Sequence, residues 1–163
     1  MSEPVKSNPA TLQVGGVVHS ENPVNDIKFH RNGQYLISSS GHSIILTDSL
    51  SGREKKRINS KSNGVGKIAY THHESCVLVS SEKKQNDIRY LCLHDNRYLR
   101  AFEGHNSKVT SLSMCPTDDH FLSASSGSEQ HKEKMVLMWD LAVANPVAKL
   151  ALPSYTDNVS VGS

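Results

Sequence analysis

An order of four short apolar segments, separated by turns, recurs three times along this 163-residue chain. The third segment of each round ends on an aspartate, and these residues, Asp48, Asp95 and Asp140, are separated by 47 and 45 residues. A period of about 40–45 residues is typical of arrays in which each repeat is one four-stranded sheet. Such a sheet cannot bury both faces by itself, so neighbouring repeats have to stack. The chain is therefore predicted to be all-β, with three four-stranded sheets in a row.

The strands of each round are predicted from alternating apolar and polar residues between turn signals. The first round is expected at residues 24–29, 35–38, 43–48 and 53–58, with an Asn32-Gly33 hairpin between its first two strands. The second is expected at 64–70, 76–80, 88–95 and 98–102, and the third at 109–114, 121–124, 135–140 and 147–152. A further apolar run at 12–18 contains Gly15-Gly16 and is expected to form a kinked strand before the first round.

The repeats divide the chain into a central folded region and two polar ends. Residues 1–10 carry two prolines among small polar residues, which predicts an unstructured lead-in. The three repeats are expected over about 11–58, 63–102 and 104–152, and residues 153–163 form a polar tail. No apolar stretch approaches the roughly 18 residues of a membrane-spanning helix, and the first residues lack an apolar run of signal-peptide length. We therefore expect neither secretion by that route nor insertion into a membrane.

Charge and cysteine content argue against several classes of function. The net charge of +2 gives no strong electrostatic footprint, so neither an extended nucleic-acid-binding surface nor an acidic tail is expected. The three cysteines, Cys76, Cys92 and Cys115, are odd in number, and none forms a Cys-x-x-Cys pair. This pattern favours reduced thiols in a cytosolic or nuclear protein over a disulfide framework.

The sequence contains no pattern that predicts catalysis, a cofactor or a metal site. It has neither a nucleophile elbow nor a phosphate-binding loop, because Gly64-Val65-Gly66 lacks the third glycine and the following helix. The His72-His73 pair with Cys76 is a poor ligand set, since neighbours alternate faces on extended backbone and no second pair follows at zinc spacing. We therefore expect no enzyme activity, no cofactor, no metal and no small-molecule substrate.

The third round is the best marked of the three, reading GHNSKVTSLSMCPTDDHFLSASSGSEQHKEKMVLMWD over residues 104–140. A Gly-His start and a Trp-Asp finish around three short strands resemble one WD repeat, the blade of a β-propeller. The resemblance implies a structural hydrogen-bond network of His105, Ser123, Trp139 and Asp140. The turn aspartate that normally completes such a network is missing, and in the first round Thr47 stands where Trp139 does. The long polar turn at 126–134 is predicted to be either a solvated loop or a binding loop.

A dense basic run lies in the expected outer strand of the first round. It reads Arg53-Glu54-Lys55-Lys56-Arg57. Charges on an outer strand protect its edge against pairing with other chains, and this is the first interpretation. The alternative is a candidate interaction surface of Arg53, Lys55, Lys56 and Arg57 that contacts phosphate or serves nuclear import.

Three segments narrow the resemblance from WD repeats in general to one family. They are Tyr70-Thr71-His72-His73, then DIRYLCLHDNRYLRAFEGH at 87–105, then VTSLSMCPTDD at 109–119. With a weaker match around residues 24–46, they resemble the small WD-repeat adaptor shared by COMPASS-type histone lysine methyltransferase complexes and the cleavage and polyadenylation machinery. The resemblance covers about residues 14–141.

That family implies a nuclear, non-enzymatic scaffold built as a propeller of roughly seven blades, of which about three are present here. The expected partners are protein subunits of a histone methyltransferase or RNA 3′-end processing complex, with indirect association to chromatin. Two alternatives stay open, namely a WD-repeat module of an unrelated complex and a truncated product without independent function. Since an incomplete ring leaves an apolar face at each end, the isolated chain is expected to self-associate or aggregate.

Overall fold

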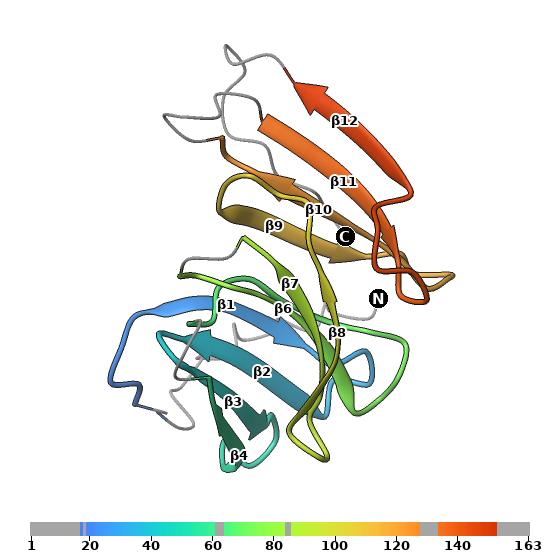
Figure 1. Cartoon of the computed structure of the whole chain (residues 1–163). Coiled ribbons are helices and arrows are strands. Elements are labelled where there is room, and N and C mark those ends of the chain that lie inside the picture. The colour runs from blue at the N-terminus through green and yellow to red at the C-terminus, as the bar shows by residue number, and fades with distance from the viewer. Residues whose placement is uncertain (1–16, 18, 61–63, 84–85, 128–133, 153–163) are drawn as a thin grey trace, which may run out of the picture.

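The computed structural model describes residues 17, 19–60, 64–83, 86–127 and 134–152. Strands in this part of the chain form three antiparallel sheets of four, in which consecutive strands pair (Figure 1). The first sheet contains β1 (Val24–Phe29), β2 (Tyr35–Ser40), β3 (Ser43–Asp48) and β4 (Glu54–Asn59). The second contains β5 (Ile68–Tyr70), β6 (Cys76–Ser80), β7 (Ile88–Cys92) and β8 (Arg97–Phe102). The third contains β9 (Val109–Met114), β10 (His120–Ser125), β11 (Lys134–Asp140) and β12 (Ala148–Leu152). The predicted all-β class and the three four-stranded sheets are confirmed.

Two tight turns explain where strands start and stop. Gly33 joins β1 to β2 with a φ of 71°, as the Asn-Gly pair predicts, because glycine takes a left-handed conformation at little cost. Asn96, with a φ of 56°, lies in the turn between β7 and β8. Asparagine is among the few other residues that tolerate this conformation. The strand predicted at 88–95 therefore ends at Cys92, where this turn begins.

β5 is shorter than the strand predicted at 64–70, because the residues just before β5 donate their backbone hydrogen bonds to Ser80. The backbone N–H of Gly66 donates to the Ser80 carbonyl at 2.8 Å, and that of Lys67 donates to Ser80 Oγ at 2.7 Å. A Cβ on Gly66 would lie 2.6 Å from Ser80 Oγ, so this close approach requires glycine.

Several predicted segments lie outside the described residues. They are the lead-in at 1–10, the tail at 153–163, residues 128–133 of the long polar turn, and the kinked strand at 12–18 apart from Val17, which is not part of a strand.

The apolar core is divided into two clusters, one at each junction between sheets. The first cluster packs Ile37 and Ile44 of the first sheet against Val77 and Leu91 of the second. The second cluster packs Phe102 of the second sheet against aromatic and aliphatic residues of the third. The first strands β1, β5 and β9 adjoin one another along the row. Within the described part of the chain, the second sheet is thus the one covered on both faces.

Candidate protein-interaction site

A hydroxyl at the centre of the third sheet connects three of the residues implicated by the WD-repeat pattern. Trp139 Nε1 on β11 donates to Ser123 Oγ on β10 at 2.8 Å, and the same oxygen lies 2.6 Å from His105 Nε2. All three side chains are buried. Because a buried polar group without a partner is costly, these contacts hold the loop before β9 against two strands.

Asp140 lies outside this network, which corrects its grouping with the other three residues. Its carboxylate accepts a hydrogen bond from the backbone N–H of Ala142 at 2.7 Å and so closes the turn after β11. The physical reason is strand geometry, since Asp140 follows Trp139 and neighbouring side chains point to opposite faces. His105 Nδ1 is buried without a hydrogen-bond partner among the described residues. The lack of a partner at Nδ1 agrees with the absence from the sequence of the turn aspartate, which normally completes this network in a WD repeat.

Burial makes the stability of the chain dependent on pH through His105. Loss of solvation lowers the pKa of its imidazole from 6.5 to about 4. Between these values the unfolded chain binds a proton that the folded chain does not bind, so the contribution of neutral His105 to stability is complete above about pH 6.5 and is lost as the pH drops towards 4. At about 1.4 kcal/mol per pKa unit, the loss approaches about 3 kcal/mol. Urea unfolding at a series of pH values between about 4 and 6.5 measures this loss of stability.

The matched variant for this prediction is His105→Gln, which keeps an amide near Ser123 and removes the titrating group. The variant should show a clearly shallower decrease in stability below pH 6.5 than the wild-type chain. Identical pH profiles would show that His105 is not the group responsible.

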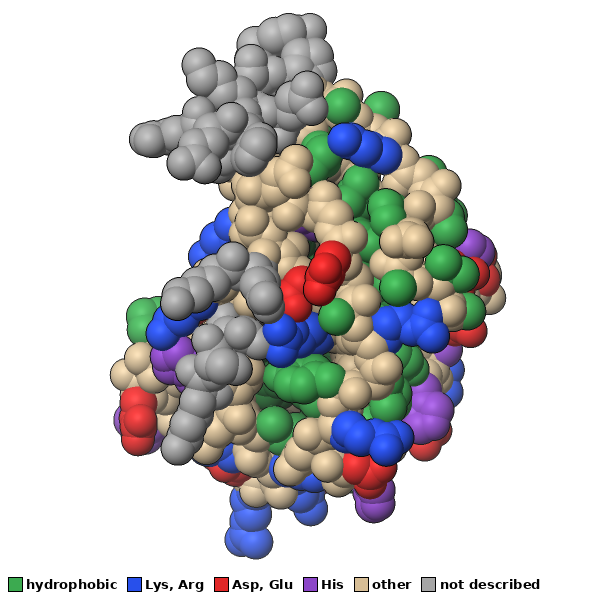
Figure 2. Space-filling model, in the orientation of Figure 1, with side chains coloured by type: hydrophobic (Ala, Val, Ile, Leu, Met, Phe, Trp, Pro, Cys, Tyr) green, Lys and Arg blue, Asp and Glu red, His purple; other side chains and the backbone are tan. Residues whose placement is uncertain are grey.

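The four cations proposed as a candidate interaction surface do not share one environment. Lys56 Nζ donates to the carbonyl oxygens of Leu93 at 2.5 Å and His94 at 2.9 Å, so it ties β4 to the second sheet. Arg57 pairs with Glu54 on its own strand at 2.6 Å, while Arg53 and Lys55 are exposed. On the face seen in Figure 2, lysine and arginine side chains lie in separate small groups. The structure therefore gives Lys56 a role in joining two sheets.

Replacing Lys56 with alanine should lower the free energy of unfolding by about 1–2 kcal/mol, because the two carbonyls lose a charged donor. Lys55→Ala is the matched control, since its exposed side chain should change stability by less than about 0.5 kcal/mol. Urea unfolding of both variants gives the comparison. Equal effects would contradict the assigned role of Lys56.

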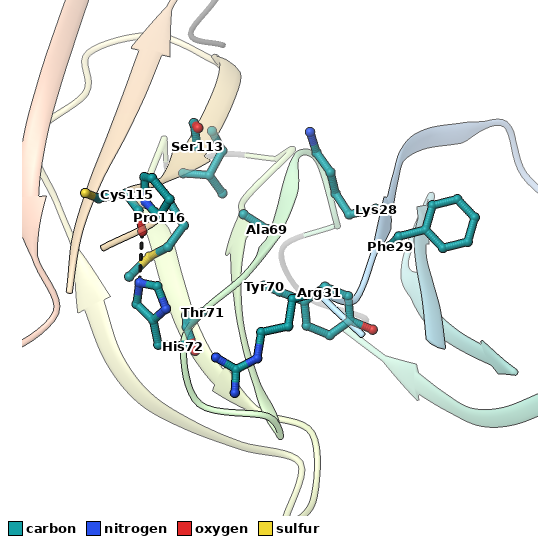
Figure 3. A pocket seen from close by; sticks show the side chains of 12 residues that line it. Lys28, Phe29, Arg31, Ala69, Tyr70, Thr71, His72, Ser113, Cys115 and Pro116 are labelled. Atoms are coloured by element: carbon teal, nitrogen blue, oxygen red, sulfur yellow. Dashed lines mark hydrogen bonds between the residues drawn. The ribbon is translucent and has the colours of Figure 1, made fainter. Parts of the chain in front are cut away.

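A cavity of about 370 Å³ lies where the first strands of the three sheets come together (Figure 3). Its lining comes from all three sheets: Lys28, Phe29 and Arg31 in and after β1; Ala69, Tyr70, Thr71 and His72 in and after β5; Leu112, Ser113, Met114, Cys115 and Pro116 in and after β9. His72 Nε2 donates to the carbonyl oxygens of Cys115 and Asp118, both at 2.9 Å. This contact ties the loop after β5 to the loop after β9 and fixes one wall.

The cavity combines an apolar lining with cationic side chains. Arg31 extends towards the His72 wall (Figure 3). The Arg31 guanidinium has a weak, exposed ion pair with Glu74, at 4.0 Å, so it remains accessible to an acidic ligand. This arrangement suits a protein segment that carries apolar and acidic residues.

The cavity is not apparent from the sequence because each repeat contributes ordinary strand and corner residues to it. The signal available in the sequence is the segment Tyr70-Thr71-His72-His73, which the family resemblance singles out and which lines the middle of the cavity. The described residues contain no group of His, Cys, Asp or Glu side chains arranged to hold a metal ion. They also include no helix with the length and apolarity needed to cross a membrane.

Comparison with known proteins places these features in a family. A match to the domain described as WD domain, G-beta repeat, covers residues 13–48 and 96–140. WD repeat-containing protein 82 of Drosophila melanogaster is 42% identical over 75% of the chain. COMPASS component SWD2 of Saccharomyces cerevisiae is 35% identical over 83%, and Set1 complex component swd2 of Schizosaccharomyces pombe is 33% identical over 75%. The matched regions span 37%, 39% and 33% of these relatives, respectively. The chain belongs to the WD-repeat family, and its three sheets are blades of a partial β-propeller.

Proposed function

We propose that the chain is a non-enzymatic scaffold that binds protein subunits of a COMPASS-type histone methyltransferase complex in the nucleus. The observation that carries this proposal is the 35% identity to COMPASS component SWD2 over 83% of the chain. The chain's association with chromatin is indirect, through the other subunits. Transcription regulation is then the process in which the scaffold takes part.

The geometry supports a scaffold because stacked sheets present loops from several repeats on one rigid frame. The cavity at the ends of β1, β5 and β9 is lined by all three repeats. Lys28 and Arg31 favour an acidic segment of the partner protein, and Tyr70 and Met114 favour apolar side chains within it. The cavity is therefore the first place to look for the partner contact.

Affinity purification of the chain from nuclear extract, followed by mass spectrometry, tests this function. Methyltransferase-complex subunits should be enriched with the wild-type chain and reduced about tenfold with Arg31→Glu, since the charge reversal repels an acidic segment. Arg97→Glu is the matched control, because Arg97 is exposed, lies outside the cavity and belongs to neither candidate surface. A full-length relative purified in parallel shows that the complex survives extraction.

The other outcomes point elsewhere. Recovery of RNA 3′-end processing subunits, or of a complex without a methyltransferase, would replace the proposed partner. Recovery of chaperones alone, alongside a complete complex on the full-length relative, would favour a truncated product without independent function.

A further inference from the structure

The strand registers show that each sheet offers an equivalent apolar face to the sheet that follows it. We call this the following face. Its four matched positions, taken from the cross-strand pairs, are Ile37, Ile44, Leu46 and Ile58 in the first sheet, Leu78, Ile88, Tyr90 and Phe102 in the second, and Leu122, Val136, Met138 and Leu150 in the third. The first two sets pack in the two core clusters. The third set has no sheet against it within the described residues, and Leu150 is 58% exposed.

The opposite side of each sheet, here called the preceding face, shows the same equivalence. Its matched positions are Ile27, Phe29 and Leu36 in the first sheet, Ile68, Tyr70 and Val77 in the second, and Leu112, Met114 and Phe121 in the third. The second and third sets pack against the sheet before them. In the first sheet, Ile27 and Phe29 on β1 are 52% and 66% exposed, whereas Ile45 and Thr47, on the β3 part of the same face, are 1% and 6% exposed.

The two ends of the row therefore carry the complementary halves of one kind of contact. The chain already makes this contact twice, between the first and second sheets and between the second and third. The matched positions at the two ends are the four on the following face of the third sheet and the three on the preceding face of the first. None of these seven residues is charged, so the contact would bury no unpaired ion at these positions. Exposed apolar side chains that gather on one face mark an interaction site.

We propose that a chain of these 163 residues binds a second copy of itself head to tail, with the preceding face of each first sheet packed on the following face of the other copy's third sheet. A contact between two different surfaces forms a closed ring when its rotation closes. Two copies supply six sheets, which lies within the range of about four to eight blades found in propellers. The pairing concerns assembly and does not depend on the partners given above.

The second copy is favoured over other occupants because it brings the side chains that the register calls for. In the proposed contact, Phe29 packs against the other copy's third sheet in the way that Tyr70 packs against the first sheet and Met114 against the second. Ile27 likewise takes the position that Ile68 has in the second sheet and Leu112 in the third. Pairing two identical end faces would not reproduce a contact that the chain makes internally. The head-to-tail arrangement repeats the existing contact at both ends.

Three exposed apolar residues provide the test, measured as solution mass by light scattering after gel filtration. Phe29→Asp blocks the preceding face, and Leu150→Asp blocks the following face. Leu50→Asp is the control, since Leu50 is 92% exposed in a turn outside both faces. Wild type and the control should have twice the 17.9-kDa chain mass. Each blocked variant should be monomeric, with its affinity for another copy weakened more than about tenfold by the charge placed in an apolar contact.

An equal mixture of the two blocked variants distinguishes head-to-tail pairing from other contacts. Leu150→Asp retains an intact preceding face and Phe29→Asp an intact following face, so the mixture should recover a dimer through one contact. Far-UV circular dichroism and Trp139 fluorescence confirm that each variant is folded. A monomeric wild-type chain, a dimer lost in only one variant, an oligomer that grows beyond two copies, or a mixture that stays monomeric would each overturn the proposal.

Discussion

Replacing Trp139 with alanine should lower the free energy of unfolding by about 3–5 kcal/mol. The indole is completely buried and stacks on Phe121, with centroids 6.0 Å apart and an interplanar angle of 12°. Its ring also meets Phe102 of the second sheet edge-on at 5.6 Å. The substitution opens a cavity at the junction of two sheets and removes the N–H that Ser123 accepts. Since domains of this size are stable by only about 5–15 kcal/mol, much of the stability would be lost.

The measurement is urea unfolding followed by far-UV circular dichroism, because Trp139 is the only tryptophan in the chain. Trp139→Phe is the matched variant, since it restores an aromatic ring and should lose clearly less than the alanine variant. A loss below about 1 kcal/mol for Trp139→Ala would mean that the second and third sheets are not held together by this cluster.

Ile37→Ala is expected to cost about 2–5 kcal/mol, because it removes a fully buried side chain from the junction between the first and second sheets. The neighbouring Ile44 and Val77 are also buried and leave little room for collapse into the space. Ile37→Val, which removes one methylene, should cost about 0.5–1.5 kcal/mol. Urea unfolding of both variants gives the comparison, and equal costs would contradict tight packing at this junction.

Local patterns in the sequence were sufficient to predict the sheets. A strand needs alternating residues and a turn signal, and both lie within a few positions, as at Asn32-Gly33. Spacing also predicted that Thr47 occupies the position in the first repeat that Trp139 occupies in the third. The strand registers agree with this, because Thr47 pairs with Leu36 and Trp139 pairs with Phe121 in the same place of each sheet.

Features that depend on contacts between repeats were not predictable. The tie from Lys56 to Leu93 joins residues 37 positions apart, and nothing near Lys56 distinguishes it from Lys55. The shortening of β5 depends on a hydroxyl supplied by Ser80, from the neighbouring strand. The cavity depends on three corners that the sequence places far apart. Candidate sites between repeats can therefore be identified only from the arrangement of the stacked sheets.

Amide hydrogen exchange in dilute solution, where contacts between copies do not contribute, tests the stacking of the three sheets most directly. Amides of β6 and β7 should exchange slowest, because the second sheet is covered on both faces, while β1 and β12 should exchange fastest among the strands. Equal protection in all three sheets, or a first or third sheet more protected than the second, would contradict the stacked arrangement.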